Sequence, residues 1–443
     1  MVAPATSAPA PDGRKGDAQD RRASGRTLEL GELLGGPDDG FARVRGPRPF
    51  AFPADHGPHP DFRTEWWYLT AHLEDDSGRT FGVQFTLFRQ ALAPPDVAPA
   101  GERGADAVDD ANRPSDWRTD TVWMAHVGLL APSVGHQSAE RFARGALGLA
   151  GVQAAPFEAW LDDWTLAGPV PDVAARNPAG RLADRERQGA VDGAVDGVLL
   201  PLELRLRVPE ADAPFTVQLT FDSERPPVLQ GEAGFSQKGS RDGNASHYYS
   251  FTRLQARGEI RIDGRSHAVR GLGWLDREWS TSVLEDGLRG WDWFALHLDD
   301  GRDLMIYHLR RADGTVGAFS AGVLVAPDGS SQRLGPDDWA LEPVETWRDE
   351  RGAAWPVAWR LAVPMADVDG VVRAQQSDQL NRLAVRYWEG MVCLDGERPG
   401  CGYLEMTGYG VDPGANPGAT HGANSGAAPG ADPGGDRSTA GSH

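Results

Sequence analysis

The feature that most constrains the fold is an internal repeat, in which strand-like segments recur in the same order. Five pairs of segments match: residues 66–75 with 291–300, 129–132 with 324–327, 162–166 with 337–341, 205–209 with 360–364, and 271–276 with 400–405. Chance can produce one such match, but five in one order indicate that a single unit has been duplicated.

The apolar pattern within each copy is typical of strands. Short runs rich in Trp, Phe, Val and Leu are separated by Asp-Gly and Gly-Arg turns, and helical periodicity is nearly absent. We therefore predict an all-β chain with two tandem domains, residues 45–285 and 286–411, each with enough strands to close a barrel or form a sandwich. Residues 1–44 and 412–443 are poor in apolar side chains and are predicted to be disordered.

The clearest hairpin spans residues 291–310. With Asp300 and Gly301 as its two turn residues, Trp293 would lie opposite His308. A barrel of about eight strands can hold one small apolar ligand, so the many aromatic side chains could line a cavity. The alternative is that they only fill the cores.

Composition and charge exclude several partners. The formal net charge is −20, whereas nucleic acids and anionic membranes require a basic surface. No apolar run reaches the length of about 18 residues that suggests a transmembrane helix. Residues 1–26 lack the apolar region of a signal peptide, which allows a cytoplasmic location. Cys393 and Cys401 flank a turn, and they could form a disulfide or remain two thiols.

Motifs for several enzyme classes are missing. The sequence has no Gly-rich phosphate loop before a helix, no His-Glu-x-x-His, no cysteine cluster and no Gly-x-Ser-x-Gly. The spacing of His56, His59, His72 and His126 specifies no metal site. We therefore expect neither a metal nor a cofactor.

Glu65 is one candidate acid, because it directly precedes the aromatic run at residues 66–68. An apolar cavity would raise its pKa and make it a proton donor. The alternative is an ion pair with Arg63 or Arg89, since buried carboxylates are usually paired.

Asp276 and Glu278 are two further candidates, and they lie between Trp274 and Trp279. The second copy has Glu405 at the position of Asp276, but only the first copy continues with Glu278 and Trp279. This asymmetry favours a site in the first domain or at the junction. A structural salt bridge between the domains is the alternative.

The segment at residues 246–250 follows a polar, Gly-rich stretch that contains Lys238. His247 could act as a base or a metal ligand, and Tyr248 and Tyr249 could donate hydrogen bonds at the mouth of a cavity. An ordinary strand would show the same pattern.

Together these segments resemble the carotenoid 1,2-hydratase (hydroxyneurosporene synthase) and AttH-like family, whose members are often labelled predicted secreted hydrolases. The resemblance lies in residues 54–57, 62–68, 84–89, 125–126, 248–250, 273–279 and 387–390. It implies two lipocalin-like antiparallel β-barrels, an extracytoplasmic location and an apolar ligand such as an isoprenoid, a carotenoid or a lipid. Hydratase members add water across a terminal carbon–carbon double bond without a cofactor. Their His-x-Trp and Tyr-x-Asp are not reproduced at residues 277–279 and 307–309.

Such a hydration requires an acid. The face of a Trp contributes about 0.5 to 2 kcal/mol to a cation, whereas enzymes lower barriers by about 8 to 23 kcal/mol. We therefore expect Asp276, Glu278 or Glu65 to supply the proton. The side chains expected to bind the ligand are Trp66, Tyr68, Gln84, Tyr248, Tyr249, Trp279, Trp291, Trp293, Tyr307 and His308. The alternative is a non-catalytic carrier of a lipid or isoprenoid, or an accessory protein of an ABC transporter.

Overall fold

The computed structural model describes residues 38–95, 119–169, 199–281, 284–285, 287–311 and 313–410. The two segments predicted to be disordered lie outside these residues, apart from residues 38–44. Within the described residues, regular structure is β-strand except for three short 3-10 helices, η1 (Ala54–His56), η3 (Ala146–Gly148) and η5 (Pro364–Ala366). No helix in this part of the chain is long and apolar enough to cross a membrane.

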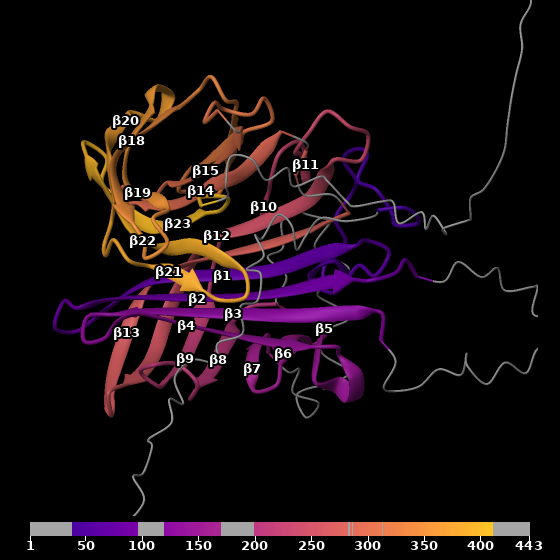
Figure 1. Cartoon of the computed structure of the whole chain (residues 1–443), viewed down its shortest axis with the longest axis horizontal. Helices are drawn as coiled ribbons and strands as arrows, with labels where there is room; N and C mark the ends of the chain where they lie inside the picture. The colour runs from indigo at the N-terminus through magenta and orange to yellow at the C-terminus, as the bar shows by residue number, and fades with distance from the viewer. Residues whose placement is uncertain are drawn as a thin grey trace, which may run out of the picture. The chain divides into compact units, whose positions relative to one another are not determined.

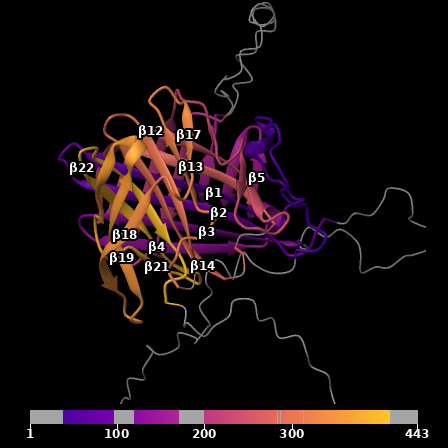
Figure 2. The same cartoon turned by 90° about the horizontal axis from the view of Figure 1, so that it is seen from above.

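The strands form two antiparallel sheets (Figures 1 and 2). The first sheet has 13 strands: β1 (Thr64–Asp75), β2 (Thr80–Ala91), β3 (Thr121–Ala131), β4 (Gly135–Ala143), β5 (Ala150–Ala154), β6 (Phe157–Leu161), β7 (Trp164–Ala167), β8 (Leu202–Val208), β9 (Phe215–Asp222), β10 (Val228–Leu229), β11 (Phe235–Gln237), β12 (Ala245–Ile262) and β13 (Arg265–Ser280).

The second sheet has 10 strands: β14 (Leu288–Leu298), β15 (Asp303–Arg311), β16 (Ala321–Val325), β17 (Ser331–Leu334), β18 (Ala340–Arg348), β19 (Ala354–Val363), β20 (Val368–Ala374), β21 (Leu380–Arg382), β22 (Arg386–Gly396) and β23 (Gly400–Met406).

The two sheets share one strand order. The first runs β4-β3-β2-β1-β13-β12-β9-β8-β7, and the second runs β17-β16-β15-β14-β23-β22-β20-β19-β18. The first sheet then continues beyond β7 with β6 and β5, which have no counterpart among the described strands of the second. Each of the five matching segment pairs falls on strands at equivalent places in these two orders. The predicted all-β class and tandem duplication are therefore confirmed, and each copy is a curled, lipocalin-like sheet.

Burial differs between strands in a way that locates the contact between the sheets. β8 alternates buried and exposed residues, as expected when one face packs on a core and the other meets solvent. β2 and β15 are instead buried on both faces almost throughout. One face of these strands packs inside its own sheet, and the other packs against the other sheet.

Adjacent residues of β1 show this division most clearly. Successive side chains of a strand point to opposite faces, so Trp67 and Leu69 pack in the interior of the first sheet. Tyr68 points the other way and packs with Trp293 and Tyr403 of the second sheet. Both sheet interiors are filled by clusters of buried apolar side chains.

The β14–β15 hairpin departs from its predicted register by one residue. Trp293 lies opposite Tyr307, because the connection has three residues, Asp299 to Gly301, and not two. The backbone N–H of Leu298 donates to the carbonyl oxygen of Arg302 at 2.8 Å. Since a shift by one residue exchanges the faces of a strand, Tyr307 and not His308 joins Trp293 on the outer face.

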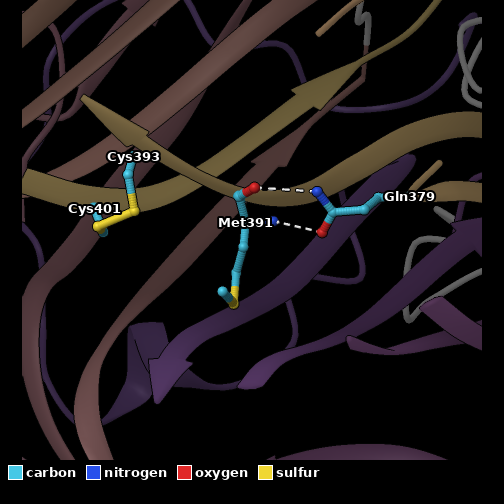
Figure 3. Close-up of a disulfide and its surroundings, with 4 residues drawn as sticks. All are labelled: Gln379, Met391, Cys393 and Cys401. Carbon is cyan, nitrogen blue, oxygen red and sulfur yellow. Dashed lines mark hydrogen bonds between the residues drawn. A yellow bond between two sulfur atoms is a disulfide. The ribbon is translucent and has the colours of Figure 1, made fainter. Parts of the chain in front are cut away.

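Cys393 and Cys401 form a disulfide between the neighbouring strands β22 and β23 (Figure 3). Beside it, the side-chain amide of Gln379 donates to the carbonyl oxygen of Met391 at 3.1 Å, and its oxygen accepts from the N–H of Met391 at 2.9 Å. The disulfide is therefore the arrangement observed among the two alternatives that the sequence left open.

Candidate functional site

A cavity of about 780 Å³, a volume that includes its open mouth, lies between the two sheets. Its walls come from the outer faces of β1, β2, β12 and β13 in the first copy and of β14, β15 and β23 in the second. The sequence allowed a site in the first domain or at the junction. The structure has this cavity at the junction, because the described sheet interiors are packed and its lining comes from both copies.

The cavity wall is mostly aromatic and aliphatic. Trp66 and Phe88 come from the first sheet, and Trp291, Trp293 and Leu309 come from the second. Trp293 meets Tyr68 edge to face, with ring centroids 5.1 Å apart. Such a wall suits an apolar ligand and presents ring faces to any cation that forms beside it.

Asp276 is the buried acid at the centre of the polar wall. Its Oδ1 accepts hydrogen bonds from Ser250 Oγ at 2.5 Å and Trp274 Nε1 at 2.7 Å, and its Oδ2 accepts one from the Tyr248 hydroxyl at 2.8 Å. Burial raises the pKa of Asp276 to about 7 even though these three hydrogen bonds lower it, and the nearby Glu278 raises it further. No cation makes an ion pair with this carboxyl among the described residues.

Glu278 lies next to Asp276 on the same face of β13, and it is paired. Its carboxylate accepts a hydrogen bond from Ser246 Oγ, and Lys238 Nζ lies 3.3 Å from its Oε1. Lys238 also lies over the Tyr307 ring, 4.1 Å from the centroid. Burial alone would lower the pKa of Lys238, but the charge of Glu278 raises it above its ordinary value.

Glu405 is a cavity acid that we did not predict. Its Oε1 accepts a hydrogen bond from Trp291 Nε1 at 2.7 Å, and burial raises its pKa to about 7. It occupies the position on β23 that Asp276 occupies on β13. The duplication contained this signal, because equivalent strands present equivalent faces to the contact between the sheets.

Glu389 adds a further buried acid beside the cavity, directly opposite Glu405 across β22 and β23. Burial, followed by the charge of Glu405, raises its pKa well above the ordinary range. Burial therefore favours the neutral forms of both carboxyls on this side of the site.

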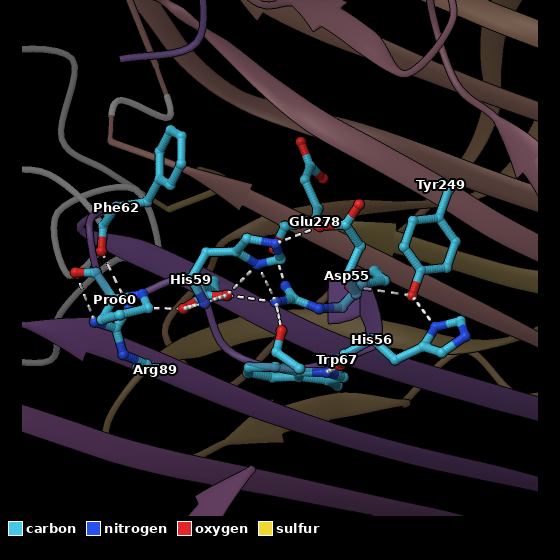
Figure 4. Close-up of polar contacts among 12 residues, drawn as sticks. Asp55, His56, His59, Pro60, Phe62, Trp67, Arg89, Tyr249 and Glu278 are labelled. Atoms are coloured by element: carbon cyan, nitrogen blue, oxygen red, sulfur yellow. Dashed lines mark hydrogen bonds and ion pairs between the residues drawn. The ribbon is translucent and has the colours of Figure 1, made fainter. Parts of the chain in front are cut away.

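Glu65 lies elsewhere and in a different state, because it is bound by His59 and Arg89, whose surroundings are shown in Figure 4. It points into the first sheet, where Arg89 Nη1 lies 2.7 Å from its Oε1 and Arg277 pairs with its Oε2. The backbone N–H of His59 also donates to Oε1 at 2.9 Å. Burial would raise the pKa of Glu65, but Arg277 and its other partners lower it to about 2. The structure thus gives Glu65 the ion pair with Arg89 that the sequence allowed as the alternative to a proton donor.

The ligand-binding residues predicted from sequence divide into two groups. Six of them line the cavity: Trp66, Tyr68, Tyr248, Trp291, Trp293 and Tyr307. The other four, Gln84, Tyr249, Trp279 and His308, do not.

Strand alternation accounts for two of these four. Trp279 points into the first sheet and stacks on His59, with ring centroids 3.8 Å apart. Tyr249 lies in the same interior, where its hydroxyl is 2.7 Å from His56 Nδ1. Glu278 directly precedes Trp279, and Tyr248 directly precedes Tyr249. Both therefore point the opposite way, into the cavity.

The other two make contacts elsewhere. Gln84 Nε2 donates to the Tyr387 hydroxyl at 2.9 Å and so links the two sheets beside the cavity. His308 Nδ1 lies 3.3 Å from Asp292 Oδ2, and its ring packs against Trp339. The one-residue shift of the β14–β15 register removes His308 from the cavity face.

Comparison with known proteins places nearly all of the described region in one family. The AttH-like family model matches residues 43–409. A crystal structure from Nitrosomonas europaea, of a protein assigned to AttH, is 31% identical, covers 83% of this chain and all of its own, and has a TM-score of 0.65.

Kievitone hydratase from Nectria haematococca is 13% identical, covers 84% of this chain and 97% of its own, and has a TM-score of 0.54. This second likeness concerns the fold alone. Among curated proteins none matches. The extent of the family match and the Nitrosomonas structure show that the chain belongs to the AttH-like family.

Proposed function

We propose that the cavity binds an apolar small molecule with a carbon–carbon double bond, and that Asp276 protonates this bond so that water adds across it. The observation that carries the proposal is the place of the Asp276 carboxyl, which is buried at the wall of an apolar cavity and, among the described residues, accepts hydrogen bonds from neutral donors only. This burial raises its pKa to about 7. At neutral pH a carboxyl group with its ordinary pKa has almost no proton to give. Asp276 retains one.

The reaction balances with the groups present. The proton of Asp276 forms a C–H bond at the less substituted alkene carbon, and a tertiary cation develops at the other carbon beside Trp291 and Trp293. Water then forms the C–O bond and releases a proton to the carboxylate of Glu405. Proton exchange between the two carboxyls and solvent restores the starting state. Pairs of acids with a pKa near the working pH suit this exchange.

The substrate class that fits is an acyclic isoprenoid or related polyene. The cavity opens to solvent, so a long ligand need insert only its terminal alkene. Apart from the Lys238–Glu278 pair, the acidic residues in the lining are Asp276 and Glu405, whose neutral forms burial favours. Kievitone hydratase shares this fold, and its name supports hydration as a chemistry that the fold can carry.

Turnover in labelled water tests the proposal. The purified protein is incubated in ¹⁸O water with acyclic carotenoids, shorter isoprenoids and prenylated phenols, and products are read by mass spectrometry. We expect a product heavier by one water molecule that carries the label, and no such product with Asp276→Asn. Unchanged turnover in Asp276→Asn would show that another group is the acid.

A non-catalytic carrier is the second candidate, and one observation favours it. Both oxygens of Asp276 already accept hydrogen bonds from the protein, which is typical of a structural carboxyl. A carrier, with or without an ABC transporter as its partner, would return an extracted ligand unaltered. An enzyme would return the hydrated product.

A further inference from the structure

We propose that His72, Cys393 and Cys401 form a zinc site once the disulfide is reduced. One ligand atom from each of these residues lies within 4.8 Å of the other two. The site is independent of the cavity chemistry, and its ligands come from both copies. The cysteines lie on β22 and β23 of the second sheet, and the histidine lies on β1 of the first.

Strand alternation explains why the three side chains meet. His72 shares the outer face of β1 with Tyr68, and Cys401 shares the outer face of β23 with Tyr403. Cys393 lies directly opposite Cys401 in the β22–β23 ladder. All three side chains therefore point to the contact between the sheets.

The histidine is also free to bind. Its Nε2 is buried and has no hydrogen-bond partner among the described residues. A buried ring nitrogen without a partner is costly, because it has given up its hydrogen bonds to water. All three residues are half-buried, so a reductant and a cation can reach them from solvent.

The chemistry of the donor set selects the metal. A thiol or phosphine reductant supplies two electrons to the disulfide, which takes up two protons and becomes two thiols. Binding of Zn²⁺ then displaces both protons and gives two thiolate ligands and one imidazole. Thiolate and imidazole donors suit Zn²⁺ and not Mg²⁺ or Ca²⁺, and the fourth position of the tetrahedron remains for water.

Zinc binding under controlled redox conditions tests the site. The full chain is reduced with a phosphine, freed of reductant under nitrogen, and titrated with Zn²⁺ against a chromophoric chelator. We expect one zinc per reduced chain, none in the oxidised chain, and affinity weakened on the order of 100-fold in His72→Asn. The control is His136→Asn, which alters a half-buried histidine on β4 whose Nε2 pairs with Asn381, and this variant should bind zinc like the wild type.

The fold is followed at the same time by circular dichroism and thermal unfolding. Zinc should raise the Tm of the reduced wild type, because it joins the two sheets, and should leave the Tm of reduced His72→Asn nearly unchanged. Three results would overturn the proposal: no zinc in the folded reduced chain, equal affinity in His72→Asn, or a reduced chain that unfolds and does not refold with zinc.

Discussion

Glu65 and Asp276 are both buried carboxyl groups of the first copy, and their surroundings shift their pKa values in opposite directions. Glu65 faces two guanidinium groups, and its pKa falls to about 2 despite burial. Asp276 receives only neutral donors and lies near another carboxylate, so burial prevails and its pKa rises to about 7. Burial alone therefore does not identify an acid, and the charge of the neighbours decides.

The positions of the two groups follow from the alternation of side chains between the two faces of a strand. Glu65 lies on the inner face of β1, where arginines balance its charge inside the first sheet. Asp276 lies on the outer face of β13, and the wall opposite is supplied by the second copy. The duplication thus creates, between the copies, an apolar space that neither copy encloses by itself.

The largest expected effect is the loss of catalysis when the neutral acid is removed. Asp276→Asn keeps the size of the side chain but cannot donate the proton, so kcat for alkene hydration should fall by about 10²- to 10⁴-fold. Ligand binding should change little. Asp299→Asn, which alters an exposed carboxyl in the β14–β15 turn, is the control and should retain wild-type kcat.

Glu65→Gln should instead affect stability. It leaves Arg89 and Arg277 buried with their charge unbalanced, which costs about 3–5 kcal/mol in the free energy of unfolding at pH 7. Because the folded-state pKa of Glu65 is lowered, its contribution is present above its ordinary pKa of 4.5 and is lost as pH falls toward about 2. Denaturant unfolding at several pH values measures this. Equal stability of variant and wild type at pH 7 would contradict the ion-pair role.

Glu405→Gln should lower kcat less than Asp276→Asn does, and it should change only the acidic side of the pH–activity profile. In the wild type, activity should fall below about pH 7 as Glu405 gains a proton and above about pH 7 as Asp276 loses one. The variant should lose about ten-fold in kcat and lack the acidic fall, since no base remains to be protonated there. A kcat profile that keeps its acidic fall in the variant would assign the base elsewhere.

The sequence predicted the fold class and the duplication, because these depend on local pattern, and it named eight of the sixteen residues that line the cavity. It did not reveal which face of a strand meets the cavity. Glu278 and Trp279 are neighbours in sequence, yet one lies in the cavity and the other in the first core. Only the packing of one copy on the other decides this.

Two further differences between the prediction from the sequence and the structure have separate causes. Because the β14–β15 connection has three residues, Tyr307 and not His308 lies opposite Trp293 on the cavity face. Lys238 lies on the chain after β11 and reaches the cavity through an irregular segment that no periodicity predicts. Glu405, by contrast, could have been found by applying the repeat to Asp276.

The protonation state of Asp276 tests the central claim most directly, and it requires no substrate. Infrared difference spectra between wild type and Asp276→Asn isolate the C=O stretch of the protonated carboxyl, which is followed as a function of pH. The structure predicts that this band persists to neutral pH and disappears with a midpoint near 7. A midpoint near the ordinary value of 3.8 would show that Asp276 is an ordinary carboxylate, and the proposed acid would be lost.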